Sequence, residues 1–133
     1  MQLIFYTLLK KKKPAEVPEP KVPADKGLGA RLVALMEERQ LYRKPGLKIS
    51  EMATELGTNT TYVSACLSGQ MGTSFHDFVT GYRIRHAQQL MRERPQMRLS
   101  QVSEESGFSN EKTFLRTFKR WTGLTPTEWK KQG

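Results

Sequence analysis

The feature that most constrains this chain is a basic helix near its C-terminal end, with apolar side chains along one face. Phe114, Phe118 and Trp121 recur at helical spacing, so they form one stripe that is predicted to be buried. The opposite side of the same helix carries polar and basic residues, which are Lys112, Thr113, Arg116 and Arg120. One face of this helix therefore packs against a core, and the other presents cations to a partner.

Both ends of this helix are marked in the sequence. Ser109 or Asn110 can cap its first turn, and Gly123 can take the left-handed conformation that closes a helix. Directly afterwards, Thr125 and Glu128 form a capping box with a proline at the first helical position between them. A short terminal helix is therefore predicted to begin at Thr125.

The basic helix belongs to a strongly basic chain. From residue 112 to the end there are six Lys or Arg residues and one acidic residue, and the formal net charge of the whole chain is +9. This balance favours nucleic acid or an anionic membrane surface as the partner, although a solvated basic surface would give the same composition. With 133 residues the chain has room for one or two small cores but not for a large enzyme. Its one cysteine, Cys66, excludes an intrachain disulfide and fits a reducing compartment.

The first 24 residues differ in composition from the rest. Residues 1–9, MQLIFYTLL, are apolar but far shorter than the roughly 20 residues that span a bilayer, and four lysines follow the run instead of preceding it as in a signal peptide. This order would suit the cytoplasmic end of a transmembrane helix in a longer protein, and a disordered start explains it equally well. Four prolines then predict an extended linker, so residues 1–24 are expected to lie outside the fold, which begins near Asp25.

A first packing helix, predicted at 26–41 from its apolar stripe, precedes two helical segments joined by a glycine-containing turn. Ser50 can cap a short helix that ends at Gly57, and Asn59 can cap the next helix. The second of these helices has a buried stripe of Val63, Cys66 and Leu67, and its outward positions are Thr60, Thr61, Ser64 and Ser68. A short helix, a turn and a second helix together make a helix-turn-helix candidate.

The same order of signals returns later in the chain. Ser74 and Asp77 form a capping-box pattern that opens a long helix, predicted at 74–93. Ser100 can then cap a short segment that closes at Gly107, just before the basic helix. At about 1.5 Å per residue the long helix measures about 28 Å, which is close to the roughly 34 Å between successive major-groove openings on one side of B-DNA. The chain therefore carries two similar helix-turn-helix units joined by one spacer helix.

These residues resemble the paired helix-turn-helix DNA-binding domain of the AraC/XylS-type family of bacterial transcription regulators, over roughly residues 28–131. The specific positions in the second unit are Gly107-Phe108-Ser109, Phe114, Arg116, Phe118-Lys119, Gly123, Thr125-Pro126 and Trp129. Supporting positions are Ile49 to Gly57, Tyr62-Val63-Ser64, Tyr82-Arg83-Ile84, Ala87 and Leu90. The resemblance implies an all-α fold of about seven helices in two helix-turn-helix subdomains joined by a long linker helix. The expected parts of the domain at 25–133 are a first helix-turn-helix at 48–70, the linker helix at 74–93, a second helix-turn-helix at 99–122 and a terminal helix at 125–131.

The resemblance also implies a function. The chain is expected to bind double-stranded DNA sequence-specifically in the cytoplasm and to regulate transcription. Activation is the commoner outcome in such families, and RNA polymerase is a candidate further partner. No cofactor or metal is expected, and the family's ligand-binding domain has no counterpart in this chain. The same features suit the cytoplasmic DNA-binding output of a longer membrane-anchored or multidomain sensor protein, and the oligomeric state stays open.

The candidate DNA-binding residues belong to the second helix of each unit and its cap. In the first unit they are Thr60, Thr61, Ser64 and Ala65, and in the second unit Asn110, Glu111, Lys112, Thr113, Arg116 and Arg120. Lys112 and Arg116 can hydrogen-bond guanine, whereas a short hydroxyl such as that of Ser64 discriminates poorly and reaches mainly phosphate. Two departures from the family pattern are Val102-Ser103, in place of an Ile-Ala type pair, and Ala65, in place of a long polar reader. The alanine weakens direct base reading by the first unit.

Other polar residues are predicted to be structural. Solvated or salt-bridged helix positions are expected for Arg83, Arg85, Arg92, Arg94 and Arg98. His76 and His86 lie on different sides of one predicted helix, so they cannot share a metal. Neither the adjacent acid pairs nor the glycines form a catalytic or phosphate-cradling pattern, so no catalytic residue is assigned. A membrane-surface adaptor anchored by residues 1–24 is the remaining alternative, and deleting these residues would release it from the bilayer.

Overall fold

The computed structural model describes residues 27–132, and all of the regular structure in this range is helical. The elements in order are α2 (Leu28–Arg39), the 3₁₀ turn η1 (Leu41–Arg43), α3 (Ile49–Glu55), α4 (Thr60–Gly69), α5 (Phe75–Glu93), α6 (Leu99–Glu105), α7 (Glu111–Thr122) and α8 (Pro126–Gln132). The expected all-α fold of about seven helices is confirmed. No helix in the described range is long and apolar enough to cross a membrane. The predictions for residues 1–24 lie outside the described residues.

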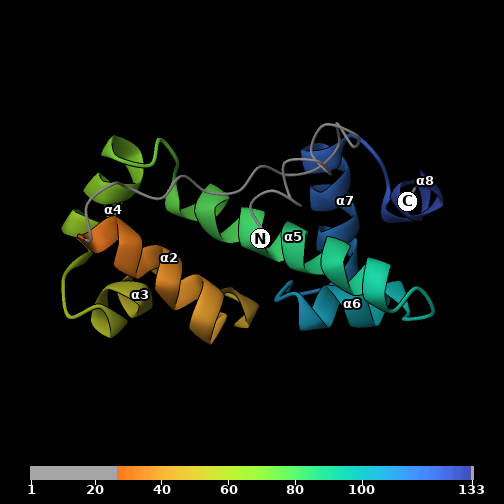
Figure 1. Cartoon of the computed structure of the whole chain (residues 1–133), viewed down its shortest axis with the longest axis horizontal. Coiled ribbons are helices and arrows are strands. Elements are labelled where there is room, and N and C mark those ends of the chain that lie inside the picture. The colour runs from red at the N-terminus through yellow and green to blue at the C-terminus, as the bar shows by residue number, and fades with distance from the viewer. Residues whose placement is uncertain (1–26, 133) are drawn as a thin grey trace.

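The 19-residue helix α5 runs through the middle of the molecule (Figure 1). The helices α2, α3 and α4 gather around its first half, and α6, α7 and α8 gather around its second half (Figure 1). Each half contains one helix-turn-helix, formed by α3 and α4 in the first unit and by α6 and α7 in the second unit. The spacer predicted from the sequence is therefore the element around which both units are built.

Two separate hydrophobic cores pack against α5. The first core joins α2, α3, α4 and the first half of α5, and Met36 and Val63 are fully buried in it. The second core joins α6, α7, α8 and the second half of α5, and Val102 and Phe118 are fully buried in it. No buried apolar side chain in residues 27–132 belongs to both cores. Each unit is thus a small hydrophobic body of its own, and α5 is the helix that they share.

Most of the predicted helix caps are confirmed. The side-chain oxygens of Asn59, Ser74 and Asn110 accept hydrogen bonds from the backbone N–H three residues later, at 3.0, 3.1 and 2.8 Å. In the capping box, the Thr125 N–H donates to Glu128 Oε1 at 2.9 Å and the Glu128 N–H donates to Thr125 Oγ1 at 3.2 Å. These bonds satisfy backbone donors that have no partner inside the helix, so they fix the residue at which each helix begins.

The predicted cap at Ser50 is wrong, because α3 begins one residue earlier, at Ile49. The carboxylate of Glu51, inside the first turn, accepts a hydrogen bond from the Lys48 N–H at 2.8 Å. Ile49 packs against the first core, which favours its inclusion in the helix. Of the two hydrogen bonds of a capping box, only the one from the cap N–H to the Glu51 carboxylate is made here. The helix therefore begins without a Ser, Thr, Asp or Asn at the cap position.

The predicted cap at Ser100 is wrong for the same reason. The helix α6 begins at Leu99, and Arg98 occupies the cap position without a side-chain cap hydrogen bond. Leu99 is partly buried against the second core, so its packing extends the helix by one residue beyond the point that Ser100 marks.

The expectation of solvated or salt-bridged arginines is wrong for Arg83 and incomplete for two others. Arg83 is partly buried, and its guanidinium donates to two backbone carbonyls at 2.8 and 2.9 Å. The guanidinium of Arg85 lies 4.5 Å from the centroid of the Tyr82 ring, and that of Arg92 lies 5.0 Å from the centroid of the Trp129 ring. These side chains cover apolar surface with their stems and place their charges over aromatic faces or carbonyl oxygens.

Between the two units, the Tyr42 hydroxyl and Nδ1 of His86 are 3.0 Å apart. Burial lowers the pKa of the His86 imidazole below its usual value, and the nearby charge of Arg43 lowers the same pKa further. Glu105 and Glu93 oppose this shift. Protonation of this imidazole is therefore less favourable in the folded chain than in the unfolded chain.

Acidification is expected to destabilise the fold through His86. The unfolded chain takes up a proton at this residue as the pH falls through about 6.5, before the folded chain does, so stability drops as the pH falls. Urea unfolding at about pH 7.5 and about pH 5.5 measures the effect. The wild type should lose more unfolding free energy than His86→Gln over this interval, and equal losses would contradict the assignment.

Candidate nucleic-acid interface

The first unit presents a neutral, short-chained face. Gly57, with a φ of 68°, makes the turn between α3 and α4, and Val63 and Leu67 bury one side of α4. The four predicted contact residues of this unit are all exposed, namely Thr60, Thr61, Ser64 and Ala65. Since α4 contains no Lys, Arg, Asp or Glu, this face offers hydroxyl groups and a methyl group but no charge.

Tyr62 is a surface residue of α4 that the sequence interpretation did not place in the interface. The residue is 63% exposed, and among the described residues it is the one large hydrophobic residue that is exposed. It follows Thr61 on the capped first turn of α4, and this position was the signal available in the sequence. A phenol at this point can donate a hydrogen bond to a phosphate oxygen.

The second unit presents a basic face. Gly107, with a φ of 95°, makes the turn between α6 and α7, and Phe114 and Phe118 are fully buried beneath α7. Of the predicted contact residues, the exposed ones are Asn110, Glu111, Lys112, Arg116 and Arg120, and Thr113 is half-buried. The oxygen of the Asn110 side chain accepts a hydrogen bond from the Thr113 N–H, so this amide caps the helix.

The cations of α7 form one continuous stripe. Lys112, Arg116 and Arg120 are four residues apart, which places them above one another on the same side of the helix. Lys119 is exposed beside them and was missing from the sequence-based set, although it follows the buried Phe118 directly. Four cations against the single acid Glu111 give this helix the charge that a polyanion requires.

The surface between the two units is hollowed along the first turn of α5. One shallow depression joins Ser64 and Ser68 of α4 to Asp77, and a second joins Asp77 to Arg120 and Trp121 of α7. Because both depressions share Asp77, the exposed Ser64 and Ser68 of α4 and Arg120, at the end of the basic stripe of α7, lie around the same turn of α5. No group of three or more potential metal ligands was found among residues 27–132.

Two capped helix-turn-helix units on one shared helix define a double helix-turn-helix DNA-binding domain. A family model described as a helix-turn-helix domain matches residues 52–132. The chain belongs to this family, in its AraC/XylS-type branch of transcription regulators.

Relatives and solved structures agree with this membership. The chain is 37% identical over 92 residues to the uncharacterized transcriptional regulatory protein YesN of Bacillus subtilis, covering 67% of this chain and 25% of that relative. The C-terminal domain of AraT, a response regulator from Geobacillus stearothermophilus, superposes with a TM-score of 0.71 at 19% identity, over 78% of this chain and 84% of that one. A transcriptional regulator from Chromobacterium violaceum with an AraC-type DNA-binding domain superposes with a TM-score of 0.68 at 23% identity. The match covers 77% of this chain and 88% of that one. The chain thus spans about a quarter of the length of YesN.

Proposed function

We propose that this domain reads two adjacent major-groove segments of duplex DNA, one with α4 and one with α7. The observation that carries the proposal is that Ser64 and Ser68 of α4 and Arg120 of α7 border two depressions that meet at Asp77, on the first turn of α5. The 19 residues of α5 span about 28 Å at about 1.5 Å per residue, which is comparable with the 34 to 36 Å of one DNA turn. One chain can therefore place both helices in successive grooves of the same duplex.

The two units are proposed to contribute differently to recognition. Arg116 and Lys112 can donate to the O6 and N7 acceptors of guanine, so the second unit supplies most of the sequence information. The hydroxyls of Thr61 and Ser64 are short, and their main contacts are expected to be with phosphate or with the nearest base edge. The first unit then positions the domain, while the second one specifies the sequence.

The cellular role that follows is bacterial transcription regulation in the cytoplasm, with activation and a contact to RNA polymerase as the expected form. The chain matches 25% of the length of one relative and 11% of another, both regulatory proteins. This proportion supports a domain that serves as the DNA-binding output of a larger regulator.

Arg116→Ala is expected to weaken binding by about 1 to 3 kcal/mol and to relax the preference for bases mainly within one of the two elements. Ser64→Ala should cost less and affect only the other element. Titration of each variant against duplexes with single base-pair changes measures both effects. Arg94→Ala, at the opposite end of α5 from the depressions, removes one exposed cation as a matched control. Equal weakening by Arg116→Ala on every sequence would show that this arginine contacts phosphate only.

A further inference from the structure

The two units need more than α5 to hold a fixed mutual angle. Their hydrophobic cores are separate, and a single long helix can bend or let packed bodies roll around it. In the second unit, Trp121 packs over α5. A Cβ added at Gly81 of α5 would lie 3.6 Å from the nearest atom of the Trp121 ring. The segment at 41–48, which comprises η1 and the loop leading to α3, supplies further contacts between the units, and we call it the strap.

The strap is tied to α5 by hydrogen bonds and by ring packing. Arg83 Nε donates to the Tyr42 carbonyl at 2.8 Å, and Arg83 Nη2 donates to the Lys44 carbonyl at 2.9 Å. The ring of Tyr42 stacks on that of Tyr82 with centroids 5.6 Å apart, and its hydroxyl lies 3.0 Å from His86 Nδ1. One partly buried guanidinium therefore holds two strap carbonyls, two residues apart, against the middle of the linker helix.

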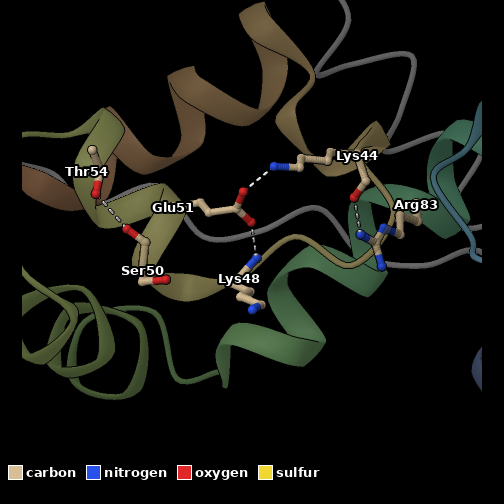
Figure 2. A network of polar contacts seen from close by, with 6 residues as sticks. All are labelled: Lys44, Lys48, Ser50, Glu51, Thr54 and Arg83. Carbon is tan, nitrogen blue, oxygen red and sulfur yellow. Dashed lines mark hydrogen bonds and ion pairs between the residues drawn. The ribbon is translucent and has the colours of Figure 1, made fainter.

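The strap is also tied to the first unit. Figure 2 shows Arg83 of α5 at the Lys44 carbonyl, and the Lys44 ammonium in an ion pair with Glu51 of α3. The same carboxylate accepts a hydrogen bond from the Lys48 N–H at 2.8 Å (Figure 2). These two contacts hold the pKa of the Glu51 carboxyl below its usual range. A continuous path of polar contacts thus runs from α5 through the strap to the first helix of the first unit.

The strap reaches the second unit at its turn. A Cβ added to Gly107 would lie 2.3 Å from the Tyr42 carbonyl oxygen and 2.9 Å from the Arg43 Cα. Arg43 Nε donates to the carbonyl of Glu105, at the end of α6, at 2.8 Å. The equivalent turn glycine of the first unit, Gly57, has nothing within 4 Å of an added Cβ. Within residues 27–132, only the second of these two turns is therefore covered by another segment.

We propose that the strap fixes the angle between the two helix-turn-helix units and so sets the spacing of DNA elements that the domain accepts. Arg83 and Gly107 are the positioning residues, and neither is proposed to touch DNA. A change of one base pair moves one element by about 3.4 Å and turns it by about 35° relative to the other. If the angle between the units is fixed, the domain binds poorly when the spacing of the elements changes by one base pair. If the angle is variable, the domain binds both spacings. This inference rests on the proposed two-element binding.

The test measures affinity for five duplexes. Three carry both elements, at the preferred spacing, at one base pair more and at one base pair fewer. The other two each keep only one of the two elements intact. Arg83→Met removes both hydrogen bonds to the strap and keeps a long apolar stem, and Arg94→Met removes the same charge from the exposed end of α5. For Arg83→Met we expect about tenfold weaker binding to the duplex that carries both elements at the preferred spacing. If the two units hold the correct mutual angle only about a tenth of the time, the apparent affinity falls by that fraction. Binding to single-element duplexes and the behaviour of Arg94→Met should stay at the wild-type level.

Gly107→Ala and Gly57→Ala form a second matched pair. Both place a Cβ on a backbone with positive φ, but only the first forces the strap away from the turn. Gly107→Ala should flatten the affinity differences between spacings, and Gly57→Ala should keep them, with helix content checked by circular dichroism. The strap proposal is overturned if both positioning variants keep the wild-type spacing preference, or if they weaken single-element duplexes as much as two-element ones. A wild-type chain that binds all five duplexes equally would instead refute the two-element function itself.

Discussion

Replacing Phe118 with alanine is expected to lower the free energy of unfolding by about 3 to 5 kcal/mol, the usual loss for an aromatic side chain removed from a core. Phe118 is fully buried in the second core. Its ring lies 5.7 Å from that of Phe114 and 5.9 Å from that of Trp129, both in edge-to-face geometry. The truncation therefore leaves a cavity where α7, α8 and their shared core meet.

Urea unfolding followed by circular dichroism measures this loss. Lys119→Ala is the control, because the neighbouring side chain is exposed and its removal should change stability by no more than about 0.5 kcal/mol. Lys119→Ala should instead weaken DNA binding, because we expect this lysine to contact a phosphate group. If Phe118→Ala unfolds like the wild type yet fails to bind DNA, the packed and exposed faces of α7 are assigned the wrong way round.

Inserting five base pairs between the two elements is expected to weaken binding by at least about tenfold, because even one good base contact is worth about 1 to 3 kcal/mol. Five base pairs are about half a helical turn, so one element moves to the far side of the duplex. A single chain joined by α5 then engages only one groove. Affinity measured by fluorescence anisotropy on otherwise identical duplexes checks this expectation.

A ten-base-pair insertion separates the monomer model from its rival. It returns the second element to the original face but moves it roughly one turn of the duplex, about 34 Å, farther away. A monomer whose two units are joined by α5 should still bind this duplex weakly. Two copies that each use one unit would recover their affinity, and this recovery would contradict the proposed reading by one chain.

The sequence was most informative where the signal was local. The apolar stripe of α7, the Asn110 cap and the closing glycine at Gly123, with its φ of 83°, all lie within one short segment and are confirmed. The Thr125 capping box is confirmed for the same reason, since both of its hydrogen bonds span three residues. Helix caps and amphipathic periods depend on neighbours along the chain, so no knowledge of the fold is needed to find them.

The misplaced features depend on neighbours that are distant in sequence. Arg83 was expected to be solvated, and its partner Tyr42 lies 41 residues away. Gly107 and Gly57 occupy equivalent turns, and only the fold shows that one of them lies against another segment. Ser50 was expected to cap a helix because it is a good capping residue, whereas core packing moved the start of the helix by one position. Contacts between segments therefore decided these cases.

The candidate interface was partly accessible from sequence. The exposed face of α7 follows from the helical period, and the structure places Lys112 and Arg116 on it. The placement of Ser64 and Arg120 around the same turn of α5 does not follow from any local pattern, because it depends on how both units pack on that helix. Tyr62 and Lys119 became candidates for the interface when the structure showed both to be exposed. Their contact with DNA, like that of the other candidate residues, stays a prediction.

Selection of bound sequences from a random duplex pool with the intact chain tests the central claim most directly. Reading by one chain through two unlike units predicts a consensus of two different elements about 10 to 10.5 base pairs apart, without twofold symmetry, and with the sharper element assigned to α7. Repeating the selection with Arg116→Ala should blur that sharper element alone. A palindromic consensus, or a single element with no preferred neighbour, would contradict the account and show that only one unit reads DNA.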